Sequence, residues 1–383
     1  MKLIDFIKSN DNWRDLLASD PYNVAVKDYE GNESDLIGLT IFVYNQIESD
    51  FHNEIVRECR GSILDLSDPK DPKVICRPFD KFGNYGEGYV TPLNWDAVSV
   101  QEKIDGSLIK FYYYKGKWRV ATNGTVNAYE CDAPARDITF GDLVTKVVGE
   151  LESLTGWFDT QNTYMFELCT PKNRVVVPHK TYTLYALGVR NNSTGQEFPV
   201  DKSQYPHYIR FPKMYEITSL DAAVAAAQEL PWDNEGYVAV DDSYNRCKIK
   251  SPDYLRVHRL AGNGSATIKR IVDLIEANEL DEVLIYFPEL QRKVDALNKL
   301  KDQIGLSLKK FYSEKIQGES FETQKDFALT VKDSPQSALW FQWRKVQQVE
   351  GKDPTIEEML SWIDTKTLRK IAERELAATW DDI

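Results

Sequence analysis

Lys103 is the residue whose setting most directly suggests chemistry. It lies in residues 102–107, Glu-Lys-Ile-Asp-Gly-Ser, and a lysine amine attacks phosphorus only when it is neutral. A free lysine, with a pKa of ~10.4, is almost wholly protonated at neutral pH, so a nucleophilic lysine needs nearby cations or partial burial to lower its pKa. The small residues Gly106 and Ser107 would let a phosphate or a sugar approach the backbone. Taken alone, the motif is explained more simply as a solvated turn between strands.

Basic residues elsewhere in the sequence could supply those cations if the fold gathers them. The candidates are Arg60, Lys81, Lys248 and Lys250, and the same charges would hold the phosphates of a nucleotide. Arg60 and Lys81 could instead be surface ion-pair partners. Lys248 and Lys250 alternate along one strand face, as residues of surface strands also do.

The order of several segments favours the functional interpretation. They are Glu-Cys-Arg-Gly at 58–61, Arg-Pro-Phe-Asp-Lys-Phe at 77–82, the segment at 102–107, Phe-Glu-Leu at 166–168, Pro-Lys-Asn-Arg at 171–174, Glu-Gly-Tyr-Val at 235–238 and Lys-Ile-Lys at 248–250. In this order they resemble the covalent nucleotidyltransferases, which are the polynucleotide ligases and RNA capping enzymes. The first two segments and the Asn-Arg-Val-Val run at 173–176 resemble the bacteriophage-type ATP-dependent RNA ligase 1 family. The resemblance covers roughly residues 40–255.

This resemblance implies an ATP-binding site and a covalent intermediate. Lys103 would attack the α-phosphate of ATP and form lysyl-AMP, and Lys248 and Lys250 would grip the α-phosphate during the chemical steps. The other implied nucleotide contacts are Tyr44, Arg60 and Lys81 around the triphosphate, Gly106, Glu167 at the ribose or a metal, Glu235 at the nucleotide or a metal-bound water, and Gly236, which gives clearance. Tyr254 matches a family tyrosine just after the lysine pair.

Some of these residues have simpler explanations, and one departs from the family pattern. Glu167 could end a strand in solvent, and Tyr44 and Tyr254 could lie at amphipathic edges of the core. Asn123 stands where close relatives carry a basic residue. An asparagine still donates hydrogen bonds to a phosphate or sugar, but without charge. Arg119 or Lys117 could substitute for the missing cation.

A divalent metal is expected, because phosphoryl transfer generally needs Mg²⁺ to offset charge. Mn²⁺ is a possible replacement. Mg²⁺ binds through few carboxylates and many waters, so it leaves little trace in a sequence. The resemblance implies Asp281 as a metal ligand, and the alternative for this residue is a solvated helix face.

The elements that position these residues form an α+β fold. The first 250 residues contain many short strands and few long helices, which favours packed antiparallel sheets. Residues 111–120 predict a hairpin that turns at Lys115-Gly116, and 181–198 predict a second with Asn-Asn-Ser-Thr-Gly as its loop. Two further strands flank residues 241–243.

After residue 251 the pattern becomes helical. Apolar residues recur on one helical face at Ile268, Ile271, Val272 and Ile275, and a second stripe runs through 290–311. Near the end, Asp353 precedes a proline and predicts a cap with Pro354 at the first helical position. We therefore expect an adenylyltransferase domain over 1–250 and an all-α domain over 251–383 that governs RNA substrate specificity.

Composition narrows the class of protein further. The chain has 383 residues and a formal net charge of −13, which argues against a nonspecific nucleic-acid coat protein but leaves open an enzyme with a few cations in a cleft. The five cysteines and four histidines are scattered, so zinc fingers and disulfides are not expected, and a reducing bacterial or phage-infected cytoplasm fits best. No apolar run suggests a membrane span or a signal peptide. We expect a monomer.

The resemblance predicts an ATP-dependent RNA ligase that joins 5′-phosphate and 3′-hydroxyl RNA ends, including those of tRNA in RNA repair. The sequence has no Gly-x-x-x-x-Gly-Lys-Ser/Thr phosphate loop, so a separate kinase or phosphatase would prepare the ends. A DNA ligase or capping enzyme is an alternative, although both normally continue into a small β-barrel where this chain is helical. A non-catalytic nucleotide- or RNA-binding module is the other alternative.

Overall fold

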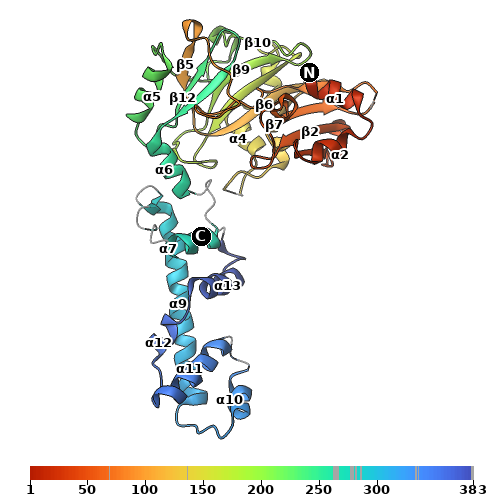
Figure 1. Cartoon of the computed structure of the whole chain (residues 1–383). Coiled ribbons are helices and arrows are strands. Elements are labelled where there is room, and N and C mark those ends of the chain that lie inside the picture. Colours follow the sequence, from red (N-terminus) through yellow and green to blue (C-terminus); the bar gives the residue numbers. More distant parts are fainter. Residues whose placement is uncertain are drawn as a thin grey trace. The chain divides into compact units, whose positions relative to one another are not determined.

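The computed structural model describes residues 1–68, 70–135, 137–261, 267–276, 280, 283–284, 287–332, 334 and 336–380. The chain divides into two compact units, Met1–Arg259 and Leu260–Ile383. The first contains antiparallel sheets with helices packed on them, and the second contains only helices in its described part (Figure 1). The predicted α+β fold class is confirmed.

Three antiparallel sheets form the first unit. The first sheet has the order β1 (Val24–Asp28), β2 (Leu39–Tyr44), β3 (Arg60–Asp65) and β4 (Lys73–Cys76). The second has the order β10 (Glu197–Phe198), β9 (Thr183–Asn191), β8 (Asn162–Cys169), β6 (Ser107–Tyr114) and β7 (Lys117–Thr122). The third has the order β11 (Met214–Tyr215), β5 (Ser99–Glu102), β12 (Gly236–Val240) and β13 (Arg246–Lys250).

The predicted hairpins are confirmed. Strands β6 and β7 turn at Lys115 and Gly116, whose φ angles of 46° and 81° are both positive, as a tight two-residue hairpin requires. Strands β9 and β10 pair around the second predicted loop, and β12 pairs with β13. Local turn chemistry therefore sets the register of the strands that carry the candidate residues.

Helices cover the outer faces of these sheets. Helices α1 (Lys2–Ser9), α2 (Trp13–Ala18) and α3 (Glu54–Glu58) pack on the first sheet, α4 (Phe140–Val148) on the second and α5 (Leu220–Gln228) on the third (Figure 1). Alternation along β6 divides its side chains between two cores. Ile109 and Phe111 join the core under α4, whereas Tyr112 and Tyr114 join the core against the first sheet.

Helix α6 (Pro252–Ala261) follows β13 directly, and most of it belongs to the first unit. The second unit contains α7 (Ile268–Glu276), α9 (Gln291–Phe311), α10 (Gln324–Val331), α11 (Ser337–Glu350), α12 (Ile356–Ser361) and α13 (Thr365–Glu375). Most residues of both predicted apolar stripes are buried, for example Ile271 in α7 and Leu297 in α9. No helix in the described part of the chain is long and apolar enough to cross a membrane.

The predicted cap at Asp353 is wrong in position. Helix α12 begins at Ile356, and Thr355 is its N-cap, with the capping-box partner Glu358. Asp353 instead accepts a hydrogen bond of 2.7 Å from the hydroxyl of Tyr312. A threonine followed by a glutamate three positions later satisfies two helix-terminal N–H groups reciprocally, which outweighs the preference for proline at the first position.

Candidate active site

Strand register brings Lys103 next to Glu235 and Lys250. In the third sheet, Glu102 at the end of β5 lies opposite Tyr237, and Gly236 at the start of β12 lies opposite Lys250. The backbone N–H of Lys103 continues the pairing by donating to the Gly236 carbonyl at 2.9 Å. Residues from distant parts of the sequence therefore meet at one end of this sheet.

Glu235 bridges two of the predicted catalytic lysines. One carboxylate oxygen lies 2.6 Å from the Lys103 amine, and the other lies 2.9 Å from the Lys250 amine. The Glu235 side chain is only 5% exposed, so water screens these contacts weakly. The positive charges of Lys103 and Lys250 outweigh burial and lower the pKa of Glu235.

The expectation that nearby cations lower the pKa of Lys103 is wrong for the protein without nucleotide. Burial does pull this pKa down, but the charges of Glu235 and Glu167 and the hydrogen bond that the Lys103 amine donates to Glu235 outweigh it, and the pKa is raised. The nucleophile candidate is therefore stored as an ammonium ion. It must lose its proton before it can attack phosphorus.

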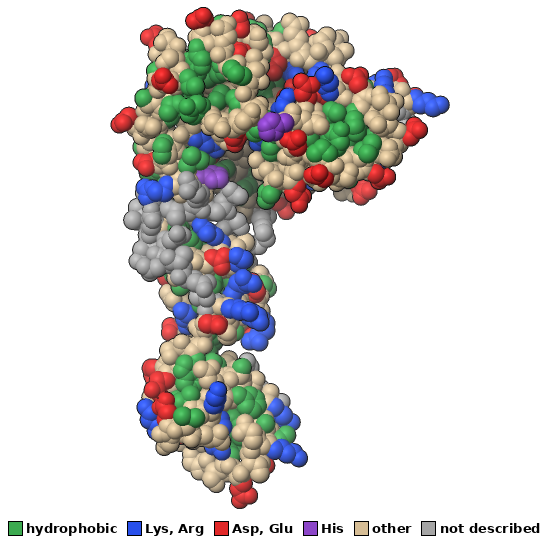
Figure 2. Space-filling model, viewed as in Figure 1, with side chains coloured by type: hydrophobic (Ala, Val, Ile, Leu, Met, Phe, Trp, Pro, Cys, Tyr) green, Lys and Arg blue, Asp and Glu red, His purple; other side chains and the backbone are tan. Residues whose placement is uncertain are grey.

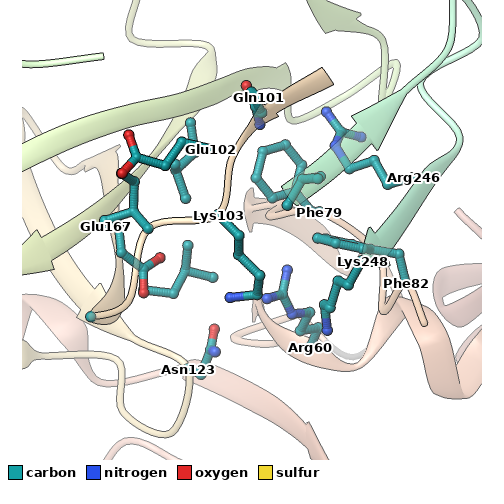
Figure 3. Close-up of a pocket in the computed structure, with 15 residues that line it drawn as sticks. Arg60, Phe79, Phe82, Gln101, Glu102, Lys103, Asn123, Glu167, Arg246 and Lys248 are labelled. Carbon is teal, nitrogen blue, oxygen red and sulfur yellow. The ribbon is translucent and has the colours of Figure 1, made fainter. Parts of the chain in front are cut away.

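A cavity of about 230 Å³ opens beside Lys103, lined mainly by the second and third sheets with loops at their ends (Figure 3). Its polar lining includes six predicted site residues, namely Arg60, Lys103, Gly106, Asn123, Glu167 and Lys248. Apolar side chains complete the walls, among them Phe79, Leu108 and Val238. Such a mixture of apolar walls and a few convergent polar groups is typical of a pocket for a small molecule or cofactor.

Two basic residues of this cavity, Arg60 and Lys248, form no ion pair with a carboxylate in the described part of the chain. The buried Nη1 atom of Arg60 has no hydrogen-bond partner among the described residues, and its guanidinium lies 5.3 Å from the centre of the Phe82 ring. The Lys248 amine lies 4.7 Å from the centre of the same Phe82 ring. Burial and the charge of Arg60, with smaller contributions from Lys81 and Lys103, lower the pKa of Lys248 to about 6. An anionic phosphate would satisfy both groups.

Glu167 is the cavity carboxylate best suited to a metal. It lies on β8 opposite Leu108, and burial raises its pKa to about 7. No cluster of three or more potential metal ligands occurs among the described residues. Because Mg²⁺ usually uses one or two carboxylates plus phosphate oxygens and water, Glu167 fits such a site without a cluster. The predicted ligand Asp281 lies outside the described residues.

Two predicted glycines are required by close backbone contacts. A Cβ atom at Gly106 would lie 2.5 Å from the Leu168 carbonyl oxygen. Gly236 has a φ of 135°, and a Cβ there would lie 2.1 Å from the Ile249 carbonyl oxygen. Any larger residue at either position would displace a strand that carries the site.

Lys81 and Tyr44 lie beside the main cavity. Lys81 lines a neighbouring hollow that shares Phe82 and Arg246 with the first. Its amine lies 5.3 Å from the centre of the Tyr44 ring and 4.8 Å from that of Phe51, which supports the cation on aromatic faces. Burial and the charge of Arg60 lower the pKa of Lys81.

Tyr254 reaches the loop that carries Lys103. It is 1% exposed on α6, and its hydroxyl donates to an Asp105 carboxylate oxygen at 2.7 Å. The other Asp105 oxygen accepts from the backbone N–H groups of Val176 and Val177 at 2.9 and 2.7 Å. Both carboxylate oxygens of Asp105 therefore accept hydrogen bonds that hold the loop in place, and the bond from Tyr254 connects helix α6 to that loop.

The suggestion that Arg119 or Lys117 replaces the charge missing at Asn123 is wrong. Arg119 pairs with Glu33 and Asp35, and Lys117 pairs with Asp35 at 3.9 Å. Neither residue lines the cavity. Both extend from β7 to acidic residues near the first sheet, so their charge is already neutralised.

Two residues near the cavity were assigned no role from the sequence. Phe82 provides the ring that Arg60 and Lys248 share, and its position directly after Lys81 was the available signal. Lys110 is fully buried on β6, and its amine donates to the Gly61 carbonyl, next to Arg60. Its sequence signal was a lysine at an inward position of an otherwise apolar strand.

A family comparison agrees with this geometry. The sequence model of the RNA ligase family matches residues 58–254, which is half of the chain and spans Arg60 to Tyr254. The chain belongs to the RNA ligase family. The resemblance predicted from the ordered motifs is thereby confirmed.

This RNA ligase family protein is similar to viral and phage proteins of different lengths. It is 31% identical over 354 residues to a putative bifunctional polynucleotide kinase/RNA ligase of Autographa californica nuclear polyhedrosis virus, covering 86% of this chain and 48% of the relative. This chain thus spans about half the length of that relative. It is 27% identical over 362 residues to an RNA ligase of Rhodothermus phage RM378, covering 74% and 80% of the two chains. A solved archaeal ATP-dependent RNA ligase aligns with a TM-score of 0.45 and 15% identity over 76% of this chain and 78% of that one.

Proposed function

We propose that this protein is an ATP-dependent RNA ligase that works through adenylation of Lys103. The observation that carries the proposal is the placement of the Lys103 amine at one side of a cavity whose basic residues Arg60 and Lys248, which form no ion pair among the described residues, fit an anionic phosphate. Membership of the RNA ligase family and the six predicted residues that line this cavity support the same conclusion.

In the first step, the Lys103 nitrogen forms a bond to the α-phosphorus of ATP, and the bond to pyrophosphate breaks. Before the attack, the Lys103 ammonium gives up a proton, and the Glu235 carboxylate oxygen, 2.6 Å from the nitrogen, is the acceptor beside it. Arg60 and Lys248 stabilise the negative charge that spreads over the phosphate oxygens as the bonds change. Lys81 and Tyr44 receive the outer phosphates.

In the second step, an RNA 5′-phosphate oxygen attacks the same phosphorus, AMP leaves Lys103, and a 5′–5′ pyrophosphate forms. In the third step, an RNA 3′-hydroxyl attacks the 5′-phosphate, and AMP departs. Activation is useful because AMP is a far better leaving group than an oxide. Lys248 lines the cavity, and Lys250 is linked to Lys103 through Glu235, so we expect both lysines to act in every step.

Glu167 would hold Mg²⁺ or Mn²⁺ together with the nucleotide's phosphates. When bound, the metal supplies positive charge that offsets the charge of the phosphate groups. The raised pKa of Glu167, about 7, means that a bound cation would also favour its ionised form.

The helical domain, which we assign to residues 251–383, would contribute to the choice of RNA. Helix α9 carries six Lys or Arg residues against two Asp, and α13 carries four against two Glu. Figure 2 shows Lys and Arg side chains gathered where these helices lie. Such a surface suits an RNA backbone, in a chain that is acidic as a whole. RNA repair, with tRNA as a substrate and ends prepared by a separate kinase or phosphatase, fits this role.

Incubation with ATP labelled on the α-phosphate tests the proposal. We expect a covalent label that survives denaturation of the protein and that mass spectrometry maps to Lys103, and joining of RNA that carries 5′-phosphate and 3′-hydroxyl ends. Lys103→Ala should abolish both, whereas the control Lys117→Ala, on an exposed lysine outside the cavity, should leave both unchanged. A label on another lysine, or ATP binding without any covalent label, would refute the proposal and favour a binding module.

A further inference from the structure

Lys110 is a buried cation that the mechanism does not use. Its side chain is 0% exposed, in the core between the first and second sheets. In the described part of the chain, no carboxylate forms an ion pair with it, and its amine donates to the Gly61 carbonyl. A buried, unpaired charge is costly to a fold, so its presence calls for a compensating role.

Lys110 lies next to the cavity floor, by which we mean the part of the cavity lining that Arg60 and Asn123 form. Gly61 follows Arg60 directly, and a Cβ atom at Gly61 would lie 2.6 Å from the Lys110 nitrogen and 2.7 Å from the Asn123 carbonyl oxygen. Arg60 and Asn123 both line the cavity. The Lys110 amine therefore lies immediately behind two residues that face the nucleotide site, and the Gly61 φ of 78° makes that approach possible.

We infer that Lys110 is a positioning residue whose buried positive charge strengthens binding of the nucleotide's phosphates from behind the cavity floor. It does not touch the nucleotide, and it acts through space and through the Arg60–Gly61 backbone. Because the charge is buried, water screens it weakly, and its effect on a nearby anion is larger than that of a surface lysine. Asn123 contributes no charge of its own, so Lys110 adds a second positive charge to that of Arg60 on this side of the site.

The electrostatic setting agrees with this role. Burial, opposed in part by Cys76 and aided by a smaller effect of the Arg60 charge, lowers the pKa of Lys110 to about 8. The amine is thus mostly charged at neutral pH even without a nucleotide. An anion on the other side of the floor would favour the charged form further.

The test compares two ligands that differ in their phosphates. Calorimetry of the full chain measures the affinity for a non-hydrolysable ATP analogue and for adenosine, in the wild type and in Lys110→Met. The methionine keeps the length and apolar packing of the side chain but removes its charge. We expect about a tenfold loss of affinity for the ATP analogue, from one buried charge near the phosphates, and no change for adenosine.

Two further variants separate charge from structure. Tyr112→Phe is the matched control, because Tyr112 is also fully buried on the same face of β6 and its hydroxyl donates to Val126 at 3.0 Å. It should lower thermal stability but leave the ratio of the two affinities unchanged. Asn123→Lys, added to Lys110→Met, restores a cation at the cavity floor and should recover most of the affinity for the analogue alone.

This inference rests on the proposed function, and the two can fail separately. A wild type that binds neither ligand would overturn the proposed nucleotide site itself. A wild type that binds both, with Lys110→Met weakening adenosine as much as the analogue or weakening neither, would overturn only the role of Lys110 and leave it a structural residue.

Discussion

Binding of ATP should draw a proton onto Lys248, and this prediction tests the charge arrangement of the cavity. Burial and four neighbouring cations give Lys248 a pKa of about 6, so at neutral pH it is mostly uncharged before the nucleotide arrives. A phosphate beside the amine stabilises the charged form and raises its pKa. The amine is therefore neutral in the free protein and protonated in the complex.

The size of the effect follows from the gap between the solution pH and this pKa. Protonating a group above its pKa costs about 1.4 kcal/mol per pH unit, and the bound phosphate must supply that energy. Between pH 7 and pH 8.5 the cost rises by about 2 kcal/mol, so this residue alone should weaken ATP binding about thirtyfold. The sign is fixed, because affinity falls as pH rises above about 6.

Calorimetry in two buffers of different ionisation enthalpy measures the proton uptake directly. With a non-hydrolysable ATP analogue at pH 7.5, we expect the wild type to take up about one proton more than Lys248→Arg. Arginine stays charged at every pH in this range. The Lys248→Arg variant should therefore keep its affinity for the ATP analogue but lose the part of the pH dependence of binding that comes from residue 248. Lys110 and Glu167 also titrate near neutral pH, and the comparison cancels their contributions.

Lys248→Met is the third protein to compare. On binding the ATP analogue it should not take up the extra proton, and it should lose much of its affinity for the analogue. A Lys248→Arg protein with the same proton uptake and the same pH slope as the wild type would refute the reasoning. That result would mean that Lys248 is already charged in the free protein, or that the phosphates bind elsewhere.

Three further substitutions test other parts of the site. Glu235→Gln removes the charge that holds the proton on Lys103, so the pH profile of single-turnover adenylation should move to lower pH; an unchanged profile would contradict the stored-ammonium interpretation. Lys250→Ala should slow joining of pre-adenylated RNA about a hundredfold, because it removes a charge beside the reacting phosphate, and a normal rate would exclude that role. Tyr254→Phe deletes the 2.7 Å hydrogen bond to Asp105 and should lower the free energy of unfolding in urea by about 1–2 kcal/mol while slowing adenylation; full activity would show that Asp105 alone holds the loop.

Short-range patterns in the sequence determined the elements that carry the site. Turn residues and alternating side chains define the hairpins β6–β7 and β12–β13, because both signals act over a few neighbouring residues. Helical periodicity likewise predicted the buried stripes of α7 and α9. The order of the motifs was sufficient to predict the RNA ligase family, since each motif keeps its chemistry and its place along the chain.

Only the tertiary structure decided which charges meet and what state they take. The sequence indicated four basic residues that could lie near Lys103. It could not show that Glu235 lies 2.6 Å from the Lys103 amine and keeps that amine protonated. It also could not reveal that Lys110 lies behind Gly61, because its partners come from other strands. A pKa depends on burial and on every charge within several ångströms, and those distances arise from sheet packing between residues far apart in sequence.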